Sequence, residues 1–154
     1  MFKTVIVSAA LAFALATGAA PVRAQSFGTA AEAKAMLEKA VADLKAHEAA
    51  ALAKFNAKDG GYRDRDLYVF CYNMSDGKFT AHPNQALMGT DVRALKVKDD
   101  PLGQRIFDTI TSAPAGSVVT VDYNFPKPGT TESVPKESFV TRVGDQGCGV
   151  GYYK

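Results

Sequence analysis

Cysteine and histidine are both scarce in this chain. Its 154 residues include two of each: Cys71 and Cys148, and His47 and His82. The cysteines lie far apart, so there is no CxxC pair, and no histidine is spaced to join them as a metal ligand. This excludes a redox enzyme built on neighbouring thiols and a zinc motif of the usual spacing. The sequence predicts no metal and no cofactor.

Catalytic signatures are missing as well. There is no GxSxG nucleophile elbow, no HExxH motif and no papain-like context around either cysteine. The glycines at 60–61, 116 and 147–151 do not form a phosphate-binding loop after a strand. A nucleophilic site made of His82, a cysteine and an aspartate is the remaining enzymatic alternative. The sequence favours a protein that is not an enzyme.

An excess of one charge is absent once the N-terminus is set aside. Residues 1–24 have the order of a signal peptide: a basic start at Lys3, an apolar run over residues 4–20, and then the segment PVRA. Val22 and Ala24 stand at positions −3 and −1 before the expected cleavage point. The alternative is an uncleaved anchor, because the apolar run is nearly long enough to cross a bilayer. Cleavage would leave residues 25–154 as a periplasmic or secreted domain with equal numbers of acidic and basic side chains. Such a chain shows no footprint for nucleic acid and no polybasic membrane surface.

Residues 29–58 predict one long amphipathic helix. Thr29 and Glu32 fit a capping box, and apolar residues recur at three- and four-residue steps as far as Phe55. Gly60 and Gly61 then end the pattern. His47 lies near the edge of the apolar stripe, where a solvated helix residue is the favoured interpretation.

Five β-rich segments follow the helix, at 67–74, 78–81, 117–125, 137–144 and 148–153. Between the second and third, Asp100 and Pro101 begin a helix with an apolar face of Leu102, Ile106 and Ile110. This order predicts one α+β domain, with the long N-terminal helix packed on a five-stranded antiparallel sheet and a helical crossover between strands 2 and 3. The other face of the sheet and the crossover, residues 82–115, can enclose a small cavity.

Several short motifs stand in a recognisable order after the long helix. They are DGK at 76–78, AHPN at 81–84, MGTD at 88–91, FPKP at 125–128, PKESFV at 135–140 and GVGYY at 149–153. Together with the aromatic-rich first strand, they resemble the single Cache domain, the extracytoplasmic PAS-like sensor module of bacterial chemoreceptors and sensor kinases. The resemblance runs from about residue 30 to residue 154. It implies a PAS-like sheet and a pocket for a small organic acid or a similar polar metabolite.

Two features depart from the family pattern. Phe125 stands where a tryptophan usually precedes the PKP motif, and the chain contains no tryptophan at all. The sequence also ends at Lys154, whereas a receptor continues into a transmembrane helix and a signalling domain. We therefore expect a free-standing, exported domain that binds a small ligand. The alternative is an accessory subunit of a separate membrane sensor or transporter, which would bind protein and have no ligand chemistry of its own.

A carboxylate in a partly desolvated pocket needs cationic or N–H donors. Lys136 and His82 are the leading donors, with Arg63 and Arg105 as further cations, and aromatic residues would form the walls. The alternatives are a solvated Lys136 and a His82 that only bonds backbone at the turn into Pro83. If His82 protonates in the complex, binding should tighten modestly as the pH falls through about 6.5. The ligand-binding residues predicted in this way are Tyr68, Phe70, Tyr72, His82, Tyr123 and Lys136.

The resemblance also implies a disulfide. In the Cache strand order the first and last strands are neighbours, so Cys71 and Cys148 meet across them in an oxidising compartment. The alternative is two buried free thiols. Cache domains often pair through their long helices, and the alanine-rich segment 33–55 would suit a homodimer of this kind.

Overall fold

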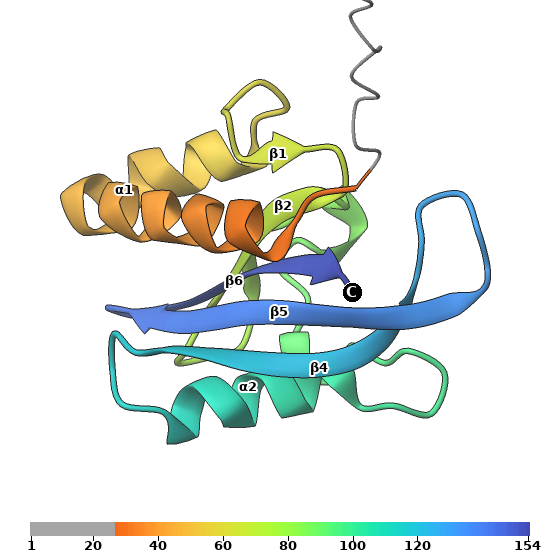
Figure 1. Ribbon diagram of the computed structural model, residues 1–154. Helices are drawn as coiled ribbons and strands as arrows, with labels where there is room; N and C mark the ends of the chain where they lie inside the picture. The colour runs from red at the N-terminus through yellow and green to blue at the C-terminus, as the bar shows by residue number, and fades with distance from the viewer. Residues whose placement is uncertain (1–26) are drawn as a thin grey trace, which may run out of the picture.

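The computed structural model in Figure 1 describes residues 27–154, so the predicted signal peptide lies outside the described part. The fold is an N-terminal helix packed on an antiparallel sheet, as the sequence predicts, and a two-residue strand, β1, joins the five predicted strands. The sheet order is β1-β2-β6-β5-β4, with β3 paired to β2. Among residues 27–154, no helix has the length and apolar composition needed to span a membrane. The elements are α1 (Ala30–Asn56), β1 (Arg63–Asp64), β2 (Leu67–Asn73), β3 (Phe79–Ala81), η1 (Gln85–Leu87), η2 (Val92–Ala94), α2 (Leu102–Ser112), β4 (Val118–Pro126), β5 (Ser133–Val143) and β6 (Gln146–Tyr153).

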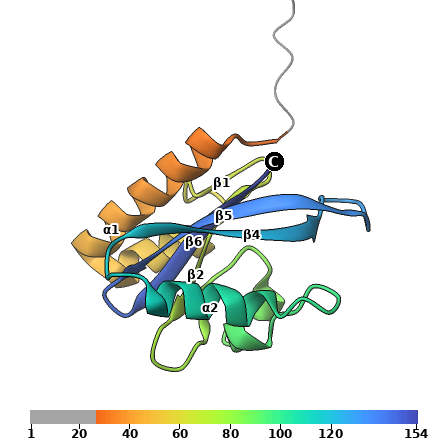
Figure 2. The same ribbon diagram turned by 60° about the horizontal axis from the view of Figure 1, so that its bottom comes forward.

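The first helix begins at the predicted capping box but does not run straight. The Thr29 hydroxyl accepts a hydrogen bond from the Glu32 N–H, and the Glu32 carboxylate accepts one from the Thr29 N–H. His47 leaves the helical region, with φ −156° and ψ 90°. Lys54 and Asp43, eleven residues apart, form an ion pair of 2.9 Å, although a straight helix would separate their Cα atoms by about 16 Å. The two arms of α1 on either side of His47 therefore lie side by side, as Figures 1 and 2 show.

The sheet separates two hydrophobic clusters. On one face α1 packs Leu37, Leu44 and Phe55 against residues such as Val69 and Val150. On the other face lies α2, seen below the sheet in Figure 1. Successive residues of a strand point to opposite faces, so β2 serves both clusters. The second cluster consists of Phe70, Tyr72, Phe79, Val92, Leu102, Ile106, Ile110, Val121 and Val140.

The start of α2 differs slightly from the prediction. Pro101 occupies the N-cap position rather than the first turn, and no side chain caps the helix there. The Asp100 carboxylate instead pairs with Arg105, at 3.0 Å from Nε and 2.9 Å from Nη2. Arg105 also donates to the Asp122 carbonyl. This arginine therefore ties α2 to the edge strand β4.

On the face toward α2, the alternate residues of β6 are Gly147, Gly149 and Gly151, and Tyr153 at the end of the strand supplies the one side chain on this face. A Cβ at Gly149 would lie 2.5 Å from Cζ of Phe70, and a Cβ at Gly151 would lie 3.0 Å from Cε of Lys136. These glycines leave room for side chains of the neighbouring strands to cross β6. The space in which Lys136 lies thus depends on the glycine pattern of β6.

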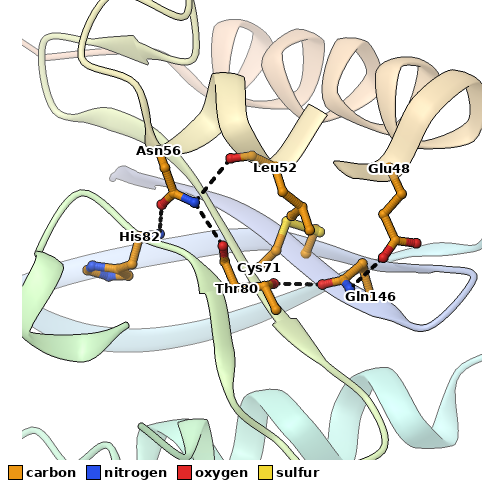
Figure 3. The surroundings of a disulfide bond; sticks show 8 residues. Glu48, Leu52, Asn56, Cys71, Thr80, His82 and Gln146 are labelled. Atoms are coloured by element: carbon orange, nitrogen blue, oxygen red, sulfur yellow. Dashed lines mark hydrogen bonds between the residues drawn. A yellow bond between two sulfur atoms is a disulfide. The ribbon is translucent and has the colours of Figure 1, made fainter. Parts of the chain in front are cut away.

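Cys71 of β2 and Cys148 of β6 are direct partners in the strand register and form a disulfide. Both are fully buried, on the side of the sheet that α1 covers. Figure 3 shows the bond beneath the second arm of α1. The predicted disulfide is confirmed, while the predicted homodimer stays a prediction.

Polar side chains near the disulfide fasten the second arm of α1 to the sheet (Figure 3). Gln146 donates from Nε2 to Glu48 at 3.0 Å and accepts from the Thr80 hydroxyl at 2.6 Å. Asn56 donates to the Thr80 carbonyl at 2.8 Å and accepts from the backbone N–H of His82 at 3.2 Å. This network fixes the end of β3, and with it the position of His82.

The disulfide should make a large contribution to stability. It closes a loop between positions 77 residues apart, which in the chain-entropy model stabilises the fold by about 4 kcal/mol. The double variant Cys71→Ala/Cys148→Ala should lose roughly this free energy of unfolding in urea titrations. Alkylation of the unreduced, denatured wild type should modify neither cysteine, and two modified thiols would contradict the bond.

Candidate ligand-binding site

A cavity of about 680 Å³ lies between the second face of the sheet and the crossover. Tyr68 and Phe70 of β2 form part of the sheet-side wall, and Tyr123 and Phe125 of β4 form another part. The crossover supplies the opposite wall. Its lining residues include Leu87, Val92, Leu95, Val97, Leu102 and Ile106. The cavity therefore lies where the sequence places it, and most of its walls are apolar.

Most of the predicted site residues gather at this cavity. Tyr68, Phe70, His82 and Tyr123 line it. Lys136 is not one of its lining residues; it lines a second cavity of about 270 Å³, to which Tyr123 also contributes.

Tyr72 lies elsewhere. It is fully buried, its ring centroid lies 5.7 Å from that of Phe107, and it lines neither cavity. Tyr72 faces the same side of the sheet as Phe70, but it lies farther along β2, beneath α2. Its place is in the core rather than at the cavity.

Lys136 is surrounded by aromatic rings. Its β5 position pairs with Tyr123 of β4 and Tyr153 of β6, so these side chains share one face of the sheet. Its Nζ lies 4.4 Å from the ring centroid of Tyr153 and 5.3 Å from those of Tyr68 and Phe125. Because Tyr68 and Phe125 line the larger cavity, the ammonium lies beside that cavity.

The electrostatic setting of Lys136 is unusual for a lysine. The residue is only 3% exposed, and within residues 27–154 its Nζ has no hydrogen bond or ion pair. Burial lowers the pKa of Lys136 to about 8, and the negative charge of Asp66 partly opposes this shift. Asp66 is itself buried and accepts from the Gly28 N–H at 2.5 Å, while its Oδ2 has no partner in the described part of the chain. The ammonium thus has a nearby counter-charge but no direct contact with it.

His82 combines the two roles that the sequence leaves open. Its Nδ1 accepts from the Asn84 N–H at 2.9 Å, which bonds the turn after Pro83, and its ring lines the cavity. With Nδ1 as the acceptor, the neutral ring carries its proton on Nε2. Burial lowers the pKa of His82 to about 4, and the charges of Arg63 and Lys136 act in the same direction. Desolvation therefore keeps the imidazole of the free protein neutral at pH 6.5, which argues against the expected tightening of binding near that pH.

Three hydrogen-bond donors at this end of the cavity are free of partners among the described residues: Lys136 Nζ, the Tyr68 hydroxyl and His82 Nε2. The ring centroid of Tyr68 lies 5.3 Å from Lys136 Nζ and 5.4 Å from the His82 ring centroid. Burial raises the pKa of Tyr68 to about 12, so its hydroxyl keeps the proton. An ammonium, a phenol and a neutral imidazole can all donate to one oxyanion. The arrangement is therefore suited to an anion.

Other polar groups near the site are already bonded. The Tyr123 hydroxyl lies 2.8 Å from the Ser138 hydroxyl, and that of Tyr153 donates to a backbone carbonyl. Arg63 donates to the Asn56 carbonyl at 3.0 Å, and Arg105 is held by Asp100. Neither of the two arginines that the sequence suggests as further cations lines the larger cavity, although the Nε of Arg63 has no partner among the described residues and its charge acts on His82.

Sequence reasoning missed Phe125 and Tyr153 as neighbours of the ammonium. The signal for Tyr153 lies in the strand register, since it is the direct partner of Lys136. In the sequence Phe125 stands out only as a departure from a family tryptophan, yet its ring forms one side of the lysine surroundings. Finding Tyr153 required the register between β5 and β6. Finding Phe125 required the positions of the side chains.

Comparison with known proteins agrees with the fold. The model of the family described as single Cache domain 2 matches residues 22–152. No curated protein sequence matches the chain.

Several solved structures are similar to the chain, among them the following three. A methyl-accepting chemotaxis protein from Vibrio parahaemolyticus RIMD 2210633 is 21% identical, with a TM-score of 0.61, over 80% of this chain and 86% of that one. The periplasmic sensor domain of a chemotaxis protein is 28% identical, with a TM-score of 0.57, over 80% and 88%. A third structure, of a Cache chemosensory domain that recognises a carboxylic acid, is 23% identical, with a TM-score of 0.57, over 80% and 86%.

Cache domains are sensory and ligand-binding modules rather than enzymes. The family match spans most of the chain, and the order of helix, strands and crossover is the one that the motifs predict. This chain belongs to the single Cache domain 2 family.

Proposed function

We propose that this protein is an extracytoplasmic domain that binds a small organic acid in the cavity beside the sheet, with Lys136 as the main charge partner. The observation that carries the proposal is the Lys136 ammonium, which is buried without a direct counter-ion. Burying an unpaired charge costs free energy. A bound carboxylate would remove that cost, which accounts for a lysine at this position.

The three free donors have different roles in this proposal. The ammonium forms a charge-assisted hydrogen bond, roughly twice as strong as a neutral one. Tyr68 and His82 supply neutral hydrogen bonds, from the phenol and from Nε2, and so orient the second oxygen of the carboxylate. Carboxylic acid recognition by one of the structurally similar Cache domains supports the same chemistry.

A periplasmic location forms part of the proposal. The N-terminal apolar run predicts export, and one of the similar structures is a periplasmic sensor domain. A separate membrane sensor or transporter that reads the loaded domain is the partner we expect.

Replacing Lys136 by methionine tests the site directly. Methionine keeps the length and apolar stem of the side chain but removes the charge. The affinity for the best short monocarboxylate in a thermal-shift screen should fall roughly 10- to 100-fold in calorimetric titration, the range for a hydrogen bond to a charged group. The stability of the apo variant should be unchanged or higher, because the wild type buries an unpaired ammonium.

The matched control is Lys45→Met, which removes the same charge from an exposed residue of α1 on the other side of the sheet. Its affinity should equal that of the wild type. If Lys136→Met also binds like the wild type, Lys136 is not part of the site and the proposal fails.

The pKa shifts predict a specific pH profile. Below about pH 8 Lys136 is protonated in the free protein and His82 stays neutral down to about 4, so affinity should be flat around pH 6.5. Above about pH 8 the free ammonium loses its proton, and affinity should fall by up to tenfold for each further unit. Titrations across this range check the profile, and a step centred near 6.5 would show instead that His82 carries the charge.

The same shift has a consequence for stability without ligand. The pKa of Lys136 is lower in the folded state than the ordinary 10.5, so the unfolded state binds more protons between about pH 8 and 10.5. Stability supplied by this group therefore rises with pH across that window. The stability advantage of Lys136→Met over the wild type should shrink there.

A further inference from the structure

Polar and apolar groups are segregated within the larger cavity. Tyr68 and His82 line this cavity and the Lys136 ammonium lies beside Tyr68, while the remaining walls are mainly hydrocarbon. Val92 and Leu102 of the crossover are almost fully buried, and Phe70 and Phe79 face them from the sheet. A ligand that fills this space therefore needs one anionic end and an apolar body.

The walls offer little to a second charged group. The only lysine or arginine that lines the larger cavity among the described residues is Lys96, an exposed residue of the loop after η2. A second carboxylate placed between the aliphatic side chains would lose its hydration without gaining a partner. No acidic residue lines the larger cavity in the described part of the chain, so the ammonium of an amino acid would also be unpaired there.

The size of the cavity excludes the smallest acids as full occupants. At about 680 Å³ it lies in the range of pockets that bury ligands of drug size. Acetate would contact the donors and leave most of the apolar wall uncovered. Each methylene group that enters the apolar part should strengthen binding by about fourfold, from about 0.8 kcal/mol per buried methylene.

From these observations we propose that the preferred ligand is a monocarboxylate with an extended aliphatic or aromatic body, and not a short acid, a dicarboxylate or an amino acid. This inference rests on the proposed function, because it places the carboxylate at Lys136. The apolar body lies along the crossover, against Leu87 and Leu95.

A series of acids tests the inference by calorimetric titration at pH 7. Acetate, butyrate and hexanoate should bind with dissociation constants that fall by about fourfold per methylene. Adipate, which has the chain length of hexanoate and a second carboxylate, should bind at least about tenfold more weakly than hexanoate because its second charge is desolvated. Equal affinity across the series, or adipate binding as tightly as hexanoate, would overturn the inference.

A pair of neighbouring variants separates the apolar wall from the fold. Leu87→Ala shortens a half-buried wall residue, whereas Met88→Ala shortens a half-buried neighbour that does not line the cavity. Leu87→Ala should weaken hexanoate binding several-fold and acetate binding less, and Met88→Ala should change neither. An equal loss for both acids in Leu87→Ala would show that the residue acts on the fold and would overturn the assignment of the wall.

The experiment distinguishes this inference from the proposed function. If short acids bind through Lys136 but chain length has no effect, the carboxylate site stands and the ligand class proposed here is wrong. If none of the acids binds, or Lys136→Met binds all of them normally, the carboxylate site itself fails and the ligand class with it.

Discussion

The Lys136 ammonium lies among aromatic rings from three strands, and no group in the described part of the chain contacts it as an ion-pair partner. Its position requires several other features. Gly151 leaves space for its stem, and Tyr123 and Tyr153 flank it in the strand register. Asp66 lowers the cost of its charge from a distance. The result is an ammonium whose charge no carboxylate of the described residues neutralises directly, so that it can pair with a bound anion.

The two faces of the sheet have different roles, one in stability and the other in the proposed ligand binding. On the α1 side the disulfide joins β2 to β6, and the polar network of Glu48, Gln146 and Asn56 fastens the helix to the strands. On the other side β2 presents the rings of Tyr68 and Phe70 to the cavity, and Gly149 of β6 leaves room for Phe70. Successive residues of a strand point to opposite faces, so alternate residues of β2 and β6 stabilise the domain on one face and shape the site on the other. Asn56 links the two sides, because it also bonds the backbone of His82.

Much of this architecture could be predicted from local patterns. The capping box at Thr29 and the strand runs indicated the helix and the sheet. The Cys71–Cys148 bond followed instead from the strand order that the resemblance to Cache domains implies. The reversal at His47 could not be predicted in this way, because both arms of α1 keep the same apolar spacing as a straight helix. The contacts that hold the arms together, such as the Asp43–Lys54 pair, appear only in three dimensions.

The site shows the same limit. Its cavity and most of its residues follow from strand order and residue type, but the state of each titratable group depends on burial. The ordinary pKa of a histidine is 6.5, whereas the desolvated ring of His82 in the free protein stays neutral to about 4. Tyr72 looks like a wall residue from its spacing with Tyr68 and Phe70, yet it lies against Phe107 in the core. A period of two residues gives the face of a strand, but not the position along it at which a cavity opens.

The most direct test of the account is the pKa of Lys136 itself, measured by NMR from the ε-carbon resonances of protein labelled with ¹³C-lysine. The Lys136 signal is the one that disappears in Lys136→Met. In the free protein it should titrate near 8, and saturation with hexanoate should raise its pKa, because a bound carboxylate stabilises the ammonium. A free-state value near the ordinary 10.5, or one that the acid leaves unchanged, would contradict the claim that a buried, unpaired ammonium forms the anion site.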